Sequence, residues 1–490
     1  MNTPARKIIC WSGIVLFVLG FAYIGLVREI EPIWVLAGLI ALPIAVVLVR
    51  RYPVVLLAGL LFVGVFKTEP AAGITFKDPT AITLLLLVIA IFVEALFAFT
   101  GTMRFSVSDL FRGQWAAAAA YFFFLTVLGV SYLYTPAPDT GGQKLLRFAV
   151  FETVAFFAPF FLLKREKDLQ KFIWVVLLLT IVLGAKTLLG VFGGTVATTK
   201  EGDIADITRI GAGQLIGVTI LILLYYKFIE SRARHLVLIC LPFLAVAMVA
   251  TVARGPMVSL VLAIFVGMLV LHKSAGLWSR KQIAIGLAVI AVVAAVGLAL
   301  VAQQRTAQAK FAQKESEFMA LLQGSENPGG TAGSRLQFYR VAIGSFAQKP
   351  FLGWGLGSWG TIYYGMERQS YPHNIILEIA VEQGVMGLGA FGIFVWLGLQ
   401  ALRRVVRETP KLAFVVPVAA FCFLISMFSG DIGNRAVWFW WGSAFALARM
   451  RSLDPTVLPA VAPMSWRRPF GVRPISRIPP DAPVGAFWKG

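Results

Sequence analysis

The sequence predicts an all-α, polytopic integral membrane protein of about fourteen transmembrane helices, with one long outer loop that carries short helices. Hydrophobic residues make up 58% of the 490 residues and charged residues 14%, and the mean hydropathy is +0.80. Apolar runs of about the length that crosses a hydrocarbon core recur along nearly the whole chain. Because every backbone group in lipid must pair internally, these runs are expected to be helices.

The boundaries of the expected spans follow the ends of the apolar runs. The third and the last run are short for a membrane crossing. The expected spans are 8–26, 32–49, 53–66, 80–100, 114–134, 147–163, 171–191, 209–229, 236–253, 255–271, 282–302, 374–402, 412–428 and 435–448.

Positive residues in the short loops predict the orientation. With a cytoplasmic N-terminus, the inner loops hold more than twice as many Lys and Arg as the outer ones, as the positive-inside rule requires. Both termini are then cytoplasmic, and the proline-rich, basic segment 451–490 is an unstructured tail. The N-terminal stretch lacks a convincing cleavage site and is expected to remain as a span. The net charge of +20 therefore indicates membrane orientation, and no nucleic-acid partner is expected.

One expected outer loop, 303–372, is far longer than the others. In its second half, Ser334 and Gln337 have capping-box spacing, which predicts that a helix starts there. Pro350 is expected to end that helix, and the glycines of FLGWGLGSWG predict a turn-rich segment. Leu336, Tyr339, Ile343 and Phe346 share one face of this helix, which is expected to lie on the membrane surface or to cover a cavity.

His373 lies where this loop re-enters the membrane. A lone histidine at an interface is usually a structural hydrogen-bonding residue. Here Asn374, Glu378 and Glu382 follow at a spacing of four on one helix face, and carboxylates that enter lipid are costly unless they serve packing networks or function. His373 is therefore a candidate functional residue. Four nearby glycines are expected to make close helix–helix contacts: Gly384, Gly387, Gly389 and Gly392.

Arginines form a second group of candidates on the outer side. Arg209 begins a span, and Arg254 lies at the tip of a tight hairpin. Each can simply snorkel to lipid headgroups. Several cations at one depth, however, suit a ligand with phosphate charge. The further outer cations are Lys144, Arg147, Arg335, Arg340 and Arg435. No phosphate-binding P-loop, dinucleotide-binding glycine pattern or metal-ligand spacing accompanies them.

The order RIGAGQLIGVTIL, ARGPMVSLVLAIF, SRLQFYRVAIGSFAQKPFLGWGLGSWG and HNIILEIAVEQGVMGLGAFGIF resembles the bacterial O-antigen ligase and O-antigen polymerase family over about residues 205–400. The resemblance implies a membrane glycosyltransferase in which His373 activates the acceptor hydroxyl while Arg209 and Arg254 hold the donor diphosphate. It also implies a metal-independent reaction without cofactor. A single displacement would invert the anomeric centre. Ligases of this type are usually drawn with about twelve spans, so the ligase or polymerase label stays open.

With this resemblance the chain divides into four parts. These are the N-terminal helices 1–200, a ligase-like core 205–400 that includes loop 303–372, the C-terminal helices 401–450 and the tail. The expected supporting residues are Asn374, Glu378, Glu382, Arg335, Arg147 and Arg435.

The expected function is transfer or polymerisation of glycan from an undecaprenyl-diphosphate-linked donor onto a glycan or lipid A-core acceptor. The reaction would take place at the periplasmic face of the bacterial inner membrane. Membrane lipids are expected partners, and a chain-length regulator is a further candidate. The rival hypothesis is a transporter or flippase of lipid-linked oligosaccharides, whose site would lie near the bilayer midplane. Few ionisable groups are expected deep in the membrane, chiefly Glu94, Glu152 and Lys186. This scarcity favours the enzyme.

Overall fold

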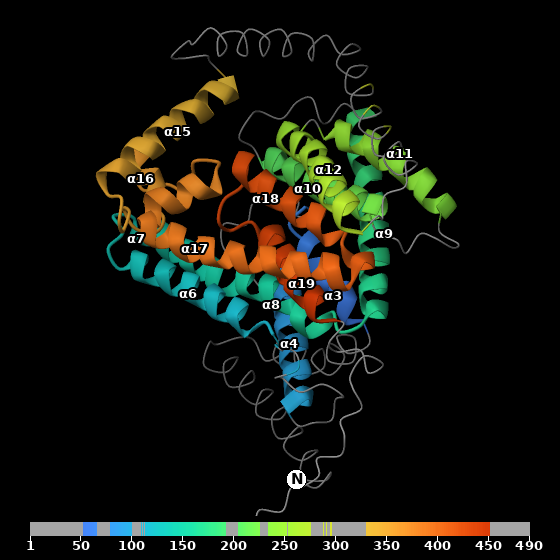
Figure 1. Cartoon of the computed structure of the whole chain (residues 1–490). Helices are drawn as coiled ribbons and strands as arrows, with labels where there is room; N and C mark the ends of the chain where they lie inside the picture. Colours follow the sequence, from blue (N-terminus) through green and yellow to red (C-terminus); the bar gives the residue numbers. More distant parts are fainter. Residues whose placement is uncertain are drawn as a thin grey trace, which may run out of the picture.

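The computed structural model describes residues 52–65, 79–99, 113–192, 204–225, 234–251, 253–275 and 330–450, together with a few isolated positions. Every regular element in these ranges is a helix (Figure 1), which confirms the all-α class for the described chain. The expected spans 8–26, 32–49 and 282–302, the first part of the long loop and the tail lie outside the described residues.

The helices follow the apolar runs closely. Their bounds are α3 Pro53–Phe62, α4 Pro79–Phe99, α6 Trp115–Tyr132, α7 Pro138–Arg147, the π turn η1 Phe148–Glu152, α8 Thr153–Leu162, α9 Glu166–Phe192, α10 Ile204–Tyr225, α11 Arg234–Ala250, α12 Arg254–Ala275, α15 Gly330–Gln348, α16 Trp359–Tyr364, α17 Ile375–Glu408, the 3-10 turn η4 Pro410–Leu412, α18 Val415–Phe428 and α19 Arg435–Arg449.

Five helical stretches in the described ranges are long and apolar enough to cross a membrane, and five shorter helices are also apolar. They support a membrane protein but do not confirm a total of about fourteen spans. One long stretch differs from the expected span 147–163, because α7, η1 and α8 form a continuous helix over 138–162. Hydropathy alone missed its first part, PDTGGQKLLR, in which Lys144 and Arg147 pair with carboxylates of the protein.

Aromatic rings pack the centre of the bundle between α6, α8, α17 and α19. The rings of Tyr121 and Phe156 stack 4.6 Å apart, and Trp438 contacts Tyr121 edge-on at 5.5 Å. In α19, every residue from Ala436 to Arg449 is buried. The shortest of the expected C-terminal spans is therefore the central helix of this core, enclosed by protein rather than by lipid.

α17 is broken at Gly384, which has φ +64° and ψ −156°. In a regular helix the N–H groups of Val385 and Met386 would donate to the carbonyls of Val381 and Glu382. Instead they donate to Pro350 and Phe351, at 2.8 and 3.2 Å.

The carbonyls of Val381 and Glu382 accept from Trp354 and Gly355, at 2.8 and 2.9 Å. Two helical hydrogen bonds are thus replaced by four bonds to segment 350–355. The break leaves none of these four backbone groups unpaired, which is the condition for irregular backbone at membrane depth.

The glycines of α17 therefore serve a different purpose from the one predicted. Gly384 supplies a left-handed backbone and admits segment 350–355, because a Cβ there would lie 2.5 Å from the carbonyl carbon of Phe351. Nothing among the described residues lies within 4 Å of a Cβ built on Gly389 or Gly392. The expected close helix–helix contacts at these two positions are absent among the described residues.

α15 leans away from the bundle and contacts it through α16 and α17 (Figure 1). It begins at Gly330, so Ser334 lies inside the helix and does not cap it. Its buried residues are Phe338, Ala342 and Ser345, whereas Ile343 on the predicted apolar face is 59% exposed. The helix turns Phe338 toward the short helix α16 and His373 instead of turning an apolar stripe toward the bundle.

We predict that Gly384→Ala lowers the thermal unfolding temperature of the purified protein in detergent. A left-handed backbone costs an L-residue about 1–2 kcal/mol, and the added methyl group also meets segment 350–355. Gly389→Ala is the matched control, since it adds the same methyl group to a helical position with open space and should be neutral or stabilising. Equal unfolding temperatures for the two variants would contradict this role of Gly384.

Candidate active site

The connection 429–434 between α18 and α19 lies at the centre of a polar region, which we call the polar end of the bundle. Asn434 caps α19 by accepting from the N–H of Ala436 at 3.2 Å, and it accepts from the amide of Gln214 on α10 at 3.4 Å. The carbonyl of Ile432 accepts from the indole of Trp438 at 2.8 Å. The connection is therefore fixed to α10 and α19.

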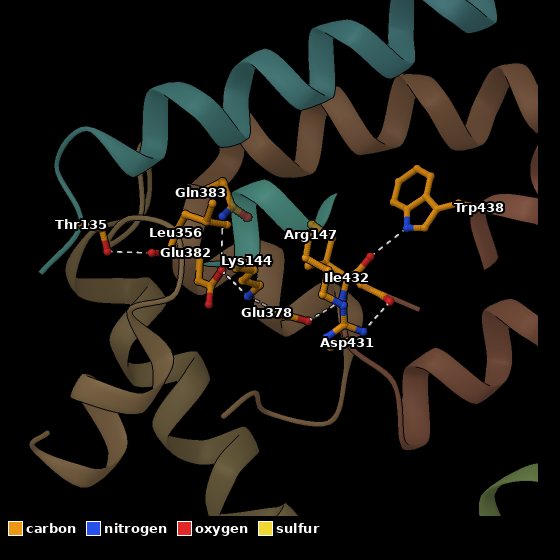
Figure 2. Close-up of polar contacts among 11 residues, drawn as sticks. Thr135, Lys144, Arg147, Leu356, Glu378, Glu382, Gln383, Asp431, Ile432 and Trp438 are labelled. Carbon is orange, nitrogen blue, oxygen red and sulfur yellow. Dashed lines mark hydrogen bonds and ion pairs between the residues drawn. The ribbon is translucent and has the colours of Figure 1, made fainter. Parts of the chain in front are cut away.

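Glu378 joins three elements of the polar end (Figure 2). One carboxylate oxygen pairs with Lys144 of α7, and the other accepts from the N–H of Ile432 at 2.9 Å. Glu382, one turn further along α17, also pairs with Lys144, at 2.6 Å. Both carboxylates are fully enclosed. Buried charges persist only when paired, so Lys144 is what permits two carboxylates on this face of α17.

Arg147 ends α7 and reaches the same connection. Its guanidinium donates to the carbonyl of Gly433 at 2.8 Å and lies 3.6 Å from Asp431. Its Nε also lies 3.7 Å from the buried carboxylate of Glu152. Residues five apart point in different directions on an α-helix, but the wider π turn of η1 brings these two to one side. The Arg147 side chain stays 53% exposed, so it can face a ligand while it holds the connection.

Ser429 links two further helices that carry predicted arginines, α12 and α15. The guanidinium of Arg335 on α15 donates to the Ser429 hydroxyl at 3.4 Å. A Cβ on Gly255, the residue after Arg254, would lie 2.8 Å from the same hydroxyl oxygen. Arg254 is the first residue of α12 and is exposed. The start of α12 and Arg335 therefore meet at Ser429.

Arg209 and Arg435 also lie at the polar end. Arg209 is half-buried in the first turns of α10, whose Gln214 contacts Asn434. Arg435 begins α19, with its guanidinium 5.8 Å from the ring of Phe151. The structure thus brings α7, α10, α12, α15 and α19, each with a predicted arginine, to one connection, as the hypothesis of an anion site requires.

His373 has a left-handed backbone, with φ +57°, which is uncommon for a residue other than glycine. Its imidazole stacks on Phe338 at 5.8 Å with an angle of 13° between the rings, and Tyr371 meets it edge-on at 4.7 Å. Within the described part of the chain its buried Nδ1 makes no hydrogen bond. Two aromatic rings, rather than hydrogen bonds, therefore hold the imidazole in place.

The pKa of His373 is lowered to about 4, chiefly by burial and also by the positive charge of Arg335, whereas Asp431 acts in the opposite direction. The ordinary value is near 6.5. Burial likewise raises the pKa of the Tyr371 hydroxyl, as do the charges of Asp431 and Glu378. At neutral pH the imidazole is uncharged and can accept a proton.

Asn374 has a structural role that its predicted grouping with Glu378 and Glu382 did not anticipate. Its side chain turns back to cap α17, accepting from the N–H groups of Ile376 and Leu377 at 3.0 and 3.1 Å. It fixes the backbone directly after His373 and does not join the carboxylate face.

Sequence reasoning missed Asp431, Phe338 and Tyr371. Asp431 follows the expected span 412–428 by three residues, and its charge alone gave no reason to place it near His373. Phe338 lay outside the face predicted for its helix. Tyr371 stands two residues before His373, and that proximity was the only available signal.

Comparison with known families bears on this region. Residues 236–392 match the family model described as O-antigen ligase. This stretch is therefore similar to the O-antigen ligase family. It contains Arg254, Arg335, His373, Glu378 and Glu382, while Lys144, Arg147, Arg209 and Arg435 lie outside the matched residues. No curated protein matches the chain.

The match confirms the family resemblance and, with the apolar helices, supports a membrane protein. The division of the chain into four parts stays a prediction. Among the described residues, no group of three or more His, Cys, Asp and Glu side chains is arranged to hold a metal ion.

We predict that Lys144→Met destabilises the folded protein by about 3–5 kcal/mol, because it leaves two carboxylates buried without a cation. Adding Glu378→Gln and Glu382→Gln to Lys144→Met should restore much of the loss, since no charge then remains buried. The measurement is thermal unfolding in detergent. Lys349→Met, at an exposed lysine 4.0 Å above the ring of Trp354, is the control and should change little. A triple variant less stable than Lys144→Met would contradict the charge-balance explanation.

Proposed function

We propose that the chain is a glycosyltransferase of surface-polysaccharide assembly that uses an undecaprenyl-diphosphate-linked glycan as donor. The acceptor is a sugar hydroxyl of a second glycan or of lipid A-core. The observation that carries the proposal is a neutral, aromatically held imidazole beside a group of arginines, in and around the stretch that matches the O-antigen ligase family model.

The proposed reaction is a single displacement. The acceptor oxygen bonds to the anomeric carbon as the bond between that carbon and the phosphate oxygen breaks, and the acceptor proton passes to His373. Because Nδ1 is buried, Nε2 is the ring nitrogen that receives the proton. An imidazole of low pKa is a weak base. It suffices where the leaving group departs early and the acceptor loses its proton late in an oxocarbenium-like transition state. The anomeric centre is inverted.

The arginines stabilise the departing diphosphate. Guanidiniums bind phosphate oxygens bidentately and stay charged at all relevant pH values, so they can neutralise the leaving group without a metal ion. Arg209 and Arg254 are the proposed donor ligands. Arg335, Arg147 and Arg435 supply further positive charge, and Arg335 and Arg147 also hold the connection that positions the site.

The proposed location is the bacterial inner membrane, with both termini cytoplasmic and the polar end in the periplasm. A flippase remains the competing function, and the break in α17 is the observation in its favour, since broken helices are common at transport sites. The break lies nine residues after the start of α17, close to His373 at the polar end, whereas carrier sites lie near the midplane. This position supports the enzyme.

We predict that the purified protein in detergent forms a new glycosidic bond from lipid-linked donor and acceptor, and that His373→Ala abolishes this product while the protein still inserts and unfolds normally. Loss of the proton acceptor typically lowers the rate about 100- to 10,000-fold. The measurement is product analysis by mass spectrometry. Normal product from His373→Ala would refute the catalytic assignment, and absence of product from the parent protein would favour the flippase.

We predict that transfer by the parent protein keeps its rate as the pH falls from 8 to about 5, because the imidazole stays neutral above its pKa of about 4. In Arg335→Gln the pKa rises, so the acid limb of kcat/KM against pH moves to higher pH. Burial, the larger cause, remains, and the shift is therefore partial. Arg340→Gln, on the exposed side of the same helix, is the control. An acid limb near pH 6.5 in the parent protein, or an unmoved limb in Arg335→Gln, would contradict the assignment.

A further inference from the structure

A series of aromatic rings leads outward from His373 along α15 and α16. Phe338 stacks on the imidazole and meets the ring of Tyr363 edge-on at 4.5 Å. Tyr363 in turn meets Tyr364 at 4.8 Å with an angle of 76°. Tyr364 is 37% exposed. The series thus begins at the proposed base and ends in solvent.

Polar side chains surround the outer end of this series. The Tyr363 hydroxyl donates to the side-chain oxygen of Gln337 at 2.9 Å, which leaves the amide N–H groups to face another acceptor. The guanidinium of Arg368 lies 4.9 Å from the centre of the Tyr364 ring. We call Gln337, Tyr363, Tyr364 and Arg368 the tyrosine platform.

Two glycines build the turn that returns Arg368 to Tyr364. Gly365 ends α16 with φ +71° and reverses the chain. Gly360 allows the backbone of Arg368 to approach so closely that a Cβ would collide with its carbonyl oxygen. The neighbouring carboxylate of Glu367 accepts from the N–H of Thr140 in the first turn of α7, at 2.6 Å. The platform is therefore anchored to α7.

We propose that the tyrosine platform binds the acceptor glycan, one or two sugar units away from the hydroxyl that reacts. This inference rests on the proposed function. Aromatic faces carry partial negative charge and attract the C–H face of a sugar ring. The amide of Gln337 and the guanidinium of Arg368 can hydrogen-bond its hydroxyl groups. Two ring contacts separate Tyr363 from His373, which matches the reach of a short oligosaccharide.

Anchoring in the membrane interface is the other use of exposed tyrosines. The exposed charges of Glu367 and Arg368 keep this segment out of the hydrocarbon but are compatible with lipid headgroups. The Gln337 amide and the Arg368 guanidinium beside the rings favour a ligand rich in hydroxyl groups. The platform is therefore assigned to a soluble glycan, and a headgroup anchor is the outcome that would overturn this assignment.

The test measures binding without requiring transfer. The probe is the lipid-free oligosaccharide released by mild acid from the source cell's own lipid-linked glycan, and the full chain is held in lipid nanodiscs. Saturation-transfer NMR gives its affinity. Tyr364→Leu and Gln337→Ala should each weaken binding about five- to tenfold. Tyr52→Leu removes another exposed tyrosine, at the far end of α3, and should leave the affinity unchanged. Arg254→Ala should also leave it unchanged, and excess inorganic pyrophosphate should not displace the probe.

Unchanged affinity in both platform variants would overturn the proposal, as would displacement of the probe by pyrophosphate. Loss of nanodisc insertion in Tyr364→Leu with unaltered sugar affinity would overturn it in favour of a membrane anchor. Failure of the proposed function is distinguishable, since it shows as absence of a glycosidic bond while oligosaccharide binding still depends on Tyr364 and Gln337.

Discussion

The pairing of the broken backbone of α17 with segment 350–355 is the interaction on which the polar end depends. Four hydrogen bonds replace the two that a regular helix would make, so the break is stabilised without water. The same pairing holds Glu382 beside Lys144 and ties the loop that follows α15 to the helix that follows His373. Segment 350–355 is thereby connected to the bundle through backbone groups rather than through side chains.

Charge balance is the second constraint. Two enclosed carboxylates on α17 share one lysine from α7, and one of them also accepts the N–H of Ile432. This arrangement explains why the polar helix α7, PDTGGQKLLR, continues directly into an apolar span. The lysine finds its counter-charges inside the protein instead of in the headgroup region, and the connection 429–434 is positioned as a result.

The sequence predicted the helical class and most span boundaries well, because apolar runs of membrane length have few alternatives. It also singled out His373 and the arginines as candidates, since charged residues near span ends are scarce enough to notice, and their roles stay predictions. The prediction failed where the structural role of a residue depended on tertiary contacts. Nothing local indicates that Gly384 breaks a helix while Gly389 does not, because the difference lies in a loop thirty residues earlier in the chain. The contacts of Phe338 were missed for a similar reason, since this residue lies off the predicted apolar face and packs on α16 and on an imidazole.

The left-handed backbone of His373 restricts which residues can stand there. Asparagine adopts this conformation more readily than most residues, whereas β-branched side chains resist it strongly. Asparagine is also close to histidine in size near the backbone but has no basic nitrogen. The His373→Asn variant should therefore keep its shape while losing the proposed proton acceptor. Such a protein is suited to trapping both substrates together, unreacted, for direct observation.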